Sequence, residues 1–140
     1  MKLKKLNMRC QIDQRIMKAP CVLVIEKNGV LRAKVAKALE KAGYTVEAVS
    51  HVLDGLRKLD EATPDLVIVG GDLPTVEGAE VCARVRQICY LPIIVLGTED
   101  RTVETLQSGA DAYMTMPLAV DELVARVHAM SRRRRRGVIA

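Results

Sequence analysis

Apolar residues along the chain fall into short continuous runs separated by stretches with helical spacing. The runs CVLVI (21–25), DLVIVG (65–70) and PIIVLG (92–97) are typical of strands buried on both faces of a parallel sheet. TVEAV (45–49) alternates apolar and polar residues, which favours a strand nearer an edge, and ADAYMT (110–115) supplies a last strand. The pattern therefore predicts five strands.

Each predicted strand is followed by a segment with helical features. Asn28 is a candidate N-cap for the first helix, which Gly43 can end, and Ser50 is a candidate N-cap for the second. The apolar positions expected on the inner faces of these two helices are Leu31, Val35, Ala38, Leu39, Ala42, Leu53, Leu56 and Leu59. A third helix, after the loop 71–78, has Val81, Cys82, Val85 and Ile88 inward; a short fourth lies near 101–108 and a fifth covers 119–134.

Five strands that alternate with five helices require a parallel sheet with helices on both faces, joined by right-handed crossovers. We therefore predict a doubly wound α/β fold, in which ligands gather outside the carboxyl ends of the strands. The residues expected at those ends are Glu26, Lys27, Gly70, Gly71, Gly97, Thr98, Met116 and Pro117. They offer no nucleophile paired with a base, so we do not expect an enzyme.

Composition narrows the class of protein further. The chain has no Trp, no Phe and three Tyr, so it lacks the aromatic platforms on which single-stranded nucleic acids stack. Its apolar runs are far shorter than the roughly 18 residues of a membrane span, so no membrane partner is expected. The four cysteines show no C-x-x-C pair and the first 20 residues show no continuous apolar signal region, which favours buried thiols and a cytoplasmic location.

Charge is distributed unevenly along the chain. The net charge is +5, but residues 1–20 hold six Lys/Arg and one acid, and residues 132–136 are five consecutive arginines. This leaves 11 basic and 16 acidic residues between positions 21 and 131, so the body is acidic. We therefore expect a basic and flexible N-terminal extension (1–19), one domain (20–131), and an Arg-rich tail or linker stub (132–140).

Three segments carry a resemblance to a known family. PDLVIVGGDLPTVEG (64–78), PIIVLGTED (92–100) and GADAYMTMPLAVDELVARVHAMSRR (109–133) resemble the receiver domain of two-component response regulators, the CheY-like family. The last segment is most similar to the OmpR/PhoB subfamily. The resemblance covers positions 21–133 and implies a flavodoxin-like, five-stranded sheet of order 2-1-3-4-5.

The resemblance also implies a phosphorylation site, and this chain departs from its pattern. The family has a phosphorylatable Asp after strand three, an acidic pair for Mg²⁺ after strand one, a Thr or Ser after strand four, and a Lys before a proline. The matching positions hold Gly70, Glu26 with Lys27, Gly97, and Met116 before Pro117. Mg²⁺ prefers several oxygen ligands, so this set predicts a degenerate pocket with no cofactor.

Within that pocket we expect Lys27 to pair with Glu26 and Met116 to fill space. Asp72, two residues beyond the end of the strand, is a poor substitute acceptor, because the acceptor must be placed within a fraction of an ångström. The Met116–Pro117 peptide matches one that is usually cis in the family, and we expect it to be cis.

The same resemblance implies a surface for partners, formed by helix four, strand five and helix five. In the OmpR/PhoB subfamily this surface forms homodimers through salt bridges. Matching positions hold Asp111, Tyr113, Glu122, Arg126 and Arg133, with Arg101 in the adjoining helix-four segment. Ala112 replaces one of the usual acids, so the network is partial.

Two functional hypotheses follow. In the first, the chain is a pseudo-receiver that acts in signal transduction or transcription regulation through protein contacts, independently of Asp phosphorylation. In the alternative, it is a small nucleic-acid-associated protein that binds phosphates through its basic ends. The candidate contacts for DNA are Arg132, Arg133, Arg134, Arg135 and Arg136, or an effector domain outside this sequence.

Overall fold

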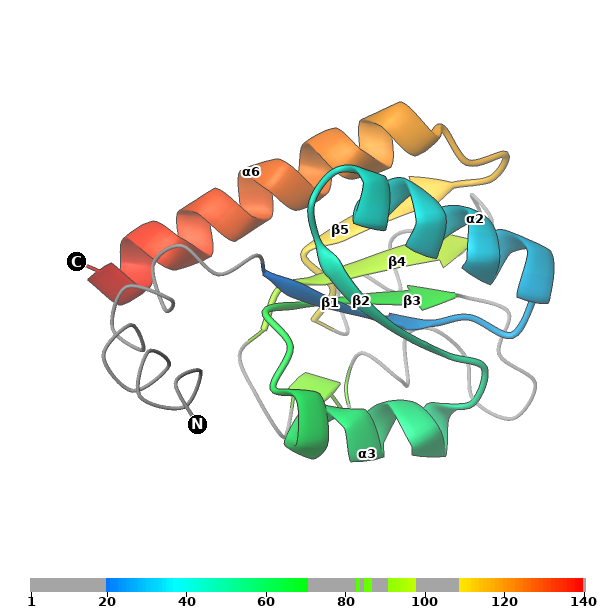
Figure 1. Cartoon of the computed structure of the whole chain (residues 1–140), viewed down its shortest axis with the longest axis horizontal. Coiled ribbons are helices and arrows are strands. Elements are labelled where there is room, and N and C mark those ends of the chain that lie inside the picture. Colours follow the sequence, from blue (N-terminus) through cyan, green and yellow to red (C-terminus); the bar gives the residue numbers. More distant parts are fainter. Residues whose placement is uncertain (1–19, 71–82, 84, 87–90, 98–108, 140) are drawn as a thin grey trace, which may run out of the picture.

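The computed structural model of the chain describes residues 20–70, 83, 85, 86, 91–97 and 109–139 (Figure 1). Its elements are β1 (Cys21–Ile25), α2 (Gly29–Lys41), β2 (Thr45–Val49), α3 (Val52–Ala62), β3 (Leu66–Gly70), β4 (Ile93–Gly97), β5 (Ala112–Thr115) and α6 (Val120–Ile139). The strands form one parallel sheet of order β2-β1-β3-β4-β5, which confirms the predicted fold.

Two of the five predicted helices fall wholly or partly outside this description. Residues 83, 85 and 86 are helical and belong to the predicted third helix, whose other residues lie outside the described part of the chain. The segment 101–108 lies outside it as well, as do residues 71–78, predicted as a loop, and the N-terminal residues 1–19.

The sheet is covered by helices on both faces, which explains why the sequences of its central strands are continuous apolar runs. In Figure 1, α2 and α6 lie on one face and α3 lies on the other. Alternate residues of β1 point to opposite faces: Val22 and Val24 join the cluster under α2 and α6, whereas Leu23 and Ile25 join the cluster over α3. All five residues of each of β1, β3 and β4 are buried.

Helix α2 begins and ends where the sequence predicts. The Asn28 side chain accepts hydrogen bonds from the backbone N–H groups of Val30 (2.9 Å) and Leu31 (3.0 Å), which satisfies two donors that the first turn leaves unpaired. Gly43 follows the last residues of the helix with φ of 102°, a conformation that favours glycine.

Helix α3 differs from the prediction by a shift in its starting point. His51, not Ser50, holds the N-cap position, and its side chain makes no capping hydrogen bond. The helix begins at Val52, and its buried residues Val52, Gly55 and Leu59 lie on one face. Leu53, expected inward, is 70% exposed.

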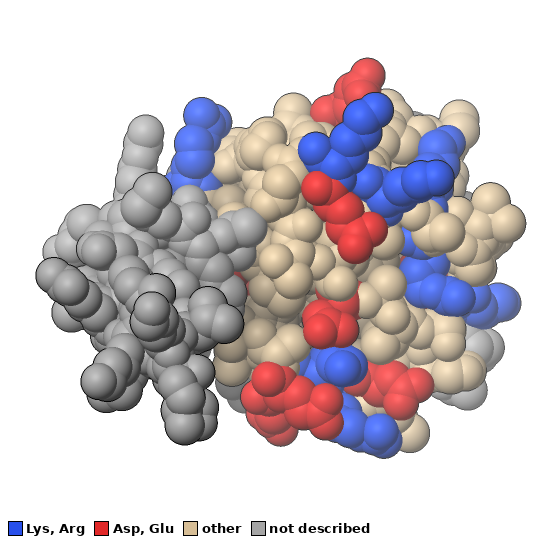
Figure 2. All heavy atoms as spheres, in the orientation of Figure 1, with Lys and Arg blue, Asp and Glu red and all other residues tan. Residues whose placement is uncertain are grey.

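The outer face of α3 carries charges of both signs, visible along the lower part of Figure 2. Arg57 lies 3.8 Å from Asp54, and Lys58 lies 3.6 Å from Glu61 and 3.7 Å from Glu47 of β2. Exposed pairs of this kind each contribute about 0–1 kcal/mol, so this face is a solvated surface rather than a source of stability.

Helix α6 is longer than the predicted 119–134. It runs to Ile139, so the backbone of all five arginines (132–136) is helical. Leu123 and Val127 are fully buried against the sheet, and the Tyr44 hydroxyl is hydrogen-bonded to Nδ1 of His128. Among the described helices, including this long one, none is apolar enough over 18 residues to cross a membrane.

Candidate functional site

The carboxyl ends of the central strands bring the predicted pocket residues to one edge of the sheet. Ile25 of β1 is in register with Val69 of β3, so Glu26 and Gly70 follow at the same level. Gly70 is paired with Leu96 of β4, which places Gly97 one step further on, opposite Thr115 of β5. Met116 and Pro117 continue from Thr115 into the turn before α6.

Glu26 lies directly against Gly70. The glutamate is 5% exposed, and a Cβ atom built on Gly70 would stand 2.4 Å from its Oε1 and 2.6 Å from its Cδ. Oε2 of Glu26 accepts a hydrogen bond of 3.0 Å from the backbone N–H of Asn28. The buried carboxylate therefore occupies the space that a side chain at position 70 would need.

The expected pairing of Lys27 with Glu26 is not found. Lys27 is exposed, and the described ion pairs of the chain do not join it to Glu26. The two side chains diverge: Lys27 is exposed to solvent, whereas Glu26 is buried with its carboxyl group beside Gly70 of β3. Arg32 binds the backbone of this turn rather than the carboxylate: its Nη1 donates to the carbonyl oxygens of Glu26 (2.9 Å) and Lys27 (3.4 Å).

Met116 does not fill the pocket, because it is 41% exposed. It lies in the turn between β5 and α6, and its backbone N–H donates to the carbonyl of Gly97 (3.0 Å). The Met116–Pro117 peptide is cis, as the sequence predicts. Asp72, the weighed substitute acceptor, lies outside the described residues.

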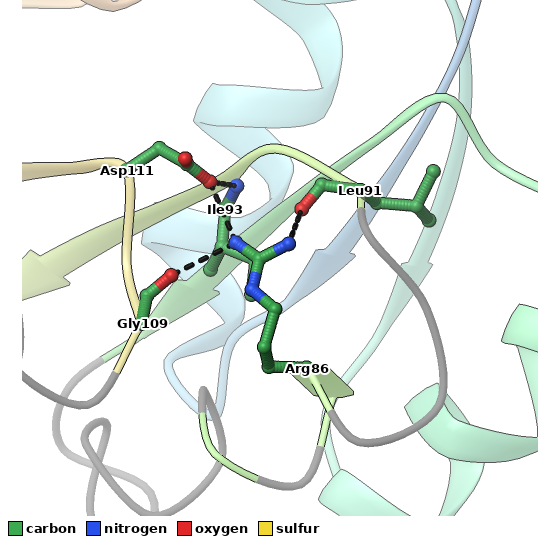
Figure 3. Close-up of polar contacts among 5 residues, drawn as sticks. All are labelled: Arg86, Leu91, Ile93, Gly109 and Asp111. Atoms are coloured by element: carbon green, nitrogen blue, oxygen red, sulfur yellow. Dashed lines mark hydrogen bonds and ion pairs between the residues drawn. The ribbon is translucent and has the colours of Figure 1, made fainter.

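A second polar cluster lies at the opposite, amino-terminal edge of the sheet (Figure 3). The Arg86 guanidinium donates to the carbonyl oxygens of Leu91 and Gly109, each at 2.8 Å, and to Oδ2 of Asp111 at 2.8 Å. The same Asp111 oxygen accepts from the backbone N–H of Ile93 at 2.7 Å. Asp111, expected on a partner surface, is thus engaged inside its own chain.

The other predicted surface residues lie on or beside α6. Glu122 and Arg126 are both exposed and are joined by a contact of 3.2 Å one turn apart. They line a shallow hollow of about 370 Å³ with Ala125, Ala129 and Met130. Tyr113 of β5 is half-buried against the core.

The remaining candidates of this surface are only partly described. Arg132 is exposed. Arg101 and the side chains of Arg133, Arg134, Arg135 and Arg136 lie outside the described part of the chain.

Two groups important to these clusters were missed by sequence reasoning. Arg32 stands on the first turn of α2, and an arginine at that place could have signalled contacts with the carbonyls of the preceding turn. Arg86 lies 25 residues from Asp111, and nothing in their spacing indicates that they meet.

A doubly wound parallel sheet of this order, with polar residues at the carboxyl edge of its central strands, defines a CheY-like, flavodoxin-type fold. The family model of the response regulator receiver domain matches residues 22–128. The chain belongs to this family.

Relatives and solved structures agree with that assignment. The chain is 36% identical over 117 residues to the transcriptional regulatory protein AfsQ1 of Streptomyces coelicolor, covering 81% of this chain and 52% of the relative. It is 38% identical over 117 residues to the virulence transcriptional regulatory protein PhoP of Salmonella typhimurium, covering 80% and 52%. The chain thus spans about half the length of these curated relatives.

A putative response regulator from Chloroflexus aurantiacus superposes with a TM-score of 0.77 and 27% identity, covering 81% of this chain and 98% of that one. A CheY-like receiver domain protein from Methanospirillum hungatei, 21% identical, has a TM-score of 0.79 over 86% of this chain and 99% of that one, and it supports the fold alone.

Proposed function

We propose that this chain is the receiver module of a transcription regulator and that it acts through protein contacts without phosphorylation of an aspartate. The observation that carries the proposal is Gly70 at the end of β3, where the family resemblance places the acceptor. Glycine has no side chain to accept a phosphoryl group, and Glu26 occupies the adjacent space.

The residues present do not fit the Mg²⁺ ion that the family's phosphorylation chemistry uses. Mg²⁺ demands near-ideal octahedral geometry and is bound through carboxylates together with substrate phosphates. Glu26 is the one carboxylate among the pocket residues of the described chain, and its Oε2 is already bonded to the Asn28 N–H. Gly70, Gly97 and Met116 add no oxygen-bearing side chain.

Without phosphorylation, the chain must act by binding another protein through its surface. We propose that this surface is formed by α6 and β5. Glu122 and Arg126 are exposed there beside a shallow hollow, which leaves both charges accessible to a second copy of the chain or to another protein. The relatives named as transcriptional regulators are about twice as long as the stretch matched here, so we propose that a DNA-binding effector domain accompanies this module in the complete regulator.

The proposal is tested by phosphodonor labelling. The chain is incubated with Mg²⁺ and phosphoramidate or acetyl phosphate, and its intact mass is measured beside a receiver domain that has the acceptor aspartate. We expect the adduct on the control receiver only. A stable phosphoryl adduct on this chain, at Asp72 or elsewhere, overturns the proposal.

The homodimer form of the proposal is tested by sedimentation over a concentration series without phosphodonor or Mg²⁺. We expect a dimer that Arg126→Glu abolishes, because the substitution removes an exposed cation that can pair with an acid of the second copy and puts a negative charge in its place. Arg57→Glu on α3 is the matched control, since Arg57 is also an exposed helical arginine beside an acid. A wild-type chain that stays monomeric excludes the homodimer and leaves the hetero-partner form.

The helical arginine run favours one further candidate function, binding to the phosphates of duplex nucleic acid. The helix α6 continues to Ile139, and five successive residues at about 100° per residue surround a helix on all sides. From Leu123 to Ala140 the printed sequence holds no Asp or Glu, so no acidic residue adjoins the run along the chain.

Fluorescence anisotropy with a labelled duplex tests this candidate. We expect binding at low salt that weakens steeply as salt rises, with a log–log slope of roughly 0.9 for each phosphate contacted. Replacing Arg134, Arg135 and Arg136 with alanine should lower the slope by about 2–3. Absence of binding by the wild-type chain at low salt removes the candidate.

A further inference from the structure

The space at Gly70 is limited by a neighbouring side chain rather than by the conformation of its own backbone. Among the described glycines, those with positive φ are Gly43 and Gly109, whereas Gly70 ends a regular strand paired with β4. An alanine can adopt that extended conformation. The three atoms nearest to a Cβ built at position 70 all belong to the Glu26 carboxyl group, at 2.4–2.8 Å.

The Glu26 carboxylate is held in this place by the turn that precedes α2. Asn28 donates its backbone N–H to Oε2, while its own side chain caps the helix. Arg32 binds the backbone carbonyl of Glu26, which fixes the point from which the side chain extends. The N-terminus of α2 also carries a partial positive charge, which favours a nearby anion.

We propose that Glu26 is an intramolecular ligand of the strand-edge pocket and that its carboxylate takes the place of the side chain missing at position 70. Glu26 and Gly70 form a complementary pair: the glutamate that follows β1 extends its carboxylate over β3, into the space that a glycine at position 70 leaves open. The inference rests on the proposed function, because it explains how a receiver without an acceptor closes its pocket with a fixed anion.

A double-mutant cycle in the full chain tests the pairing, with thermal unfolding as the measurement. Gly70→Ala should lower the melting temperature when Glu26 is present, since the new methyl group must displace a buried and hydrogen-bonded carboxylate. In the Glu26→Ala background the same change should raise the melting temperature by about 2–5 °C, because the space is vacant and alanine has less backbone entropy to lose than glycine. The expected signature is thus a change of sign.

Gly55→Ala is the matched control. A Cβ at Gly55 would stand 2.3 Å from Cδ1 of Ile25, the residue before Glu26, but on the opposite face of the sheet. Its effect on the melting temperature should have the same sign and size in both backgrounds, because Gly55 does not face Glu26.

The outcomes separate this inference from the proposed function. Equal effects of Gly70→Ala in both backgrounds overturn the pairing and leave the phosphorylation-independent function standing. If the Gly70→Ala variant does not fold but the double variant with Glu26→Ala does, the pairing is supported. If neither the Gly70→Ala variant nor the double variant folds, while the Glu26→Ala variant does, the pairing is wrong. A phosphoryl adduct on the wild-type chain overturns the proposed function whatever the cycle gives.

Discussion

The guanidinium of Arg86 and the carboxylate of Asp111 form an ion pair with 2.8 Å between Nη2 and Oδ2, and this pair closes the amino-terminal edge of the sheet (Figure 3). Oδ2 of Asp111 also accepts from the N–H of Ile93, the first residue of β4. One carboxylate therefore joins the helix at residue 86 to the beginnings of β4 and β5. Asp111 acts in the fold of its own chain, while its side chain stays 45% exposed.

Replacing Asp111 with alanine should accordingly destabilise the chain. The variant loses a charge-assisted hydrogen bond and leaves the N–H of Ile93 without its acceptor, which together should lower the free energy of unfolding by about 1–2 kcal/mol. Urea denaturation measures the change. Glu122→Ala is the control, because its contact with Arg126 is exposed and within one helix, and its loss should cost under about 0.5 kcal/mol. Equal effects of the two substitutions would contradict this role of Asp111.

The two N-caps allow a second matched prediction. Asn28→Ala removes two capping hydrogen bonds from α2 and should lower the free energy of unfolding by about 1 kcal/mol. His51→Ala at the N-cap of α3 removes no side-chain cap bond and should change it little. Thermal unfolding of both variants, measured in parallel, provides the comparison, and a larger loss for His51→Ala would show that the caps are wrongly assigned.

How much the sequence predicts depends on the range of the interactions. The strands were predictable because a sheet covered on both faces demands continuous apolar runs, and α2 was predictable because Asn28 caps a helix only a few residues away. The N-cap of α3 is predicted at Ser50, because a hydroxyl is a good cap, but the N-cap is His51 and the helix begins at Val52, from where Val52 and Leu59 both reach the core. Tertiary burial outweighed the local capping preference there.

The candidate site shows the same limit. Sequence reasoning placed Glu26, Gly70 and Gly97 at one edge of the sheet, because parallel strands bring their carboxyl ends together. It paired Glu26 with its neighbour Lys27, whereas the structure places the Glu26 carboxylate over Gly70, 44 positions away in the printed sequence. Contacts over such separations depend on sheet register and side-chain reach, which spacing along the chain does not encode.

The corrected inner face of α3 gives a third prediction. Leu59 is 7% exposed and packs in the core cluster beneath the helix, so Leu59→Ala should lower the free energy of unfolding by about 2–4 kcal/mol. Leu53 lies on the solvent side, and Leu53→Ala should change it by less than about 0.5 kcal/mol. Chemical denaturation of both variants distinguishes this face from the one expected from sequence, for which the two losses would be similar.

The last prediction concerns the contact between Tyr44 and His128, which joins the turn before β2 to α6. The Tyr44 hydroxyl bonds to Nδ1 of His128, and the two rings lie 5.2 Å apart between centroids. Tyr44 is buried, so Tyr44→Phe removes the hydroxyl while keeping the packed ring. We expect Tyr44→Phe to lower the free energy of unfolding by about 0.5–1.5 kcal/mol.

A double-mutant cycle with His128→Ala isolates the hydrogen bond from the packing of the tyrosine ring. If the bond carries the effect, Tyr44→Phe should cost much less once His128 is absent, because its partner is already gone. His51→Ala serves as the control background, since His51 lies at the start of α3 on the other face of the sheet. Full additivity of Tyr44→Phe and His128→Ala would mean that the hydrogen bond between them does not help to hold α6 against the sheet.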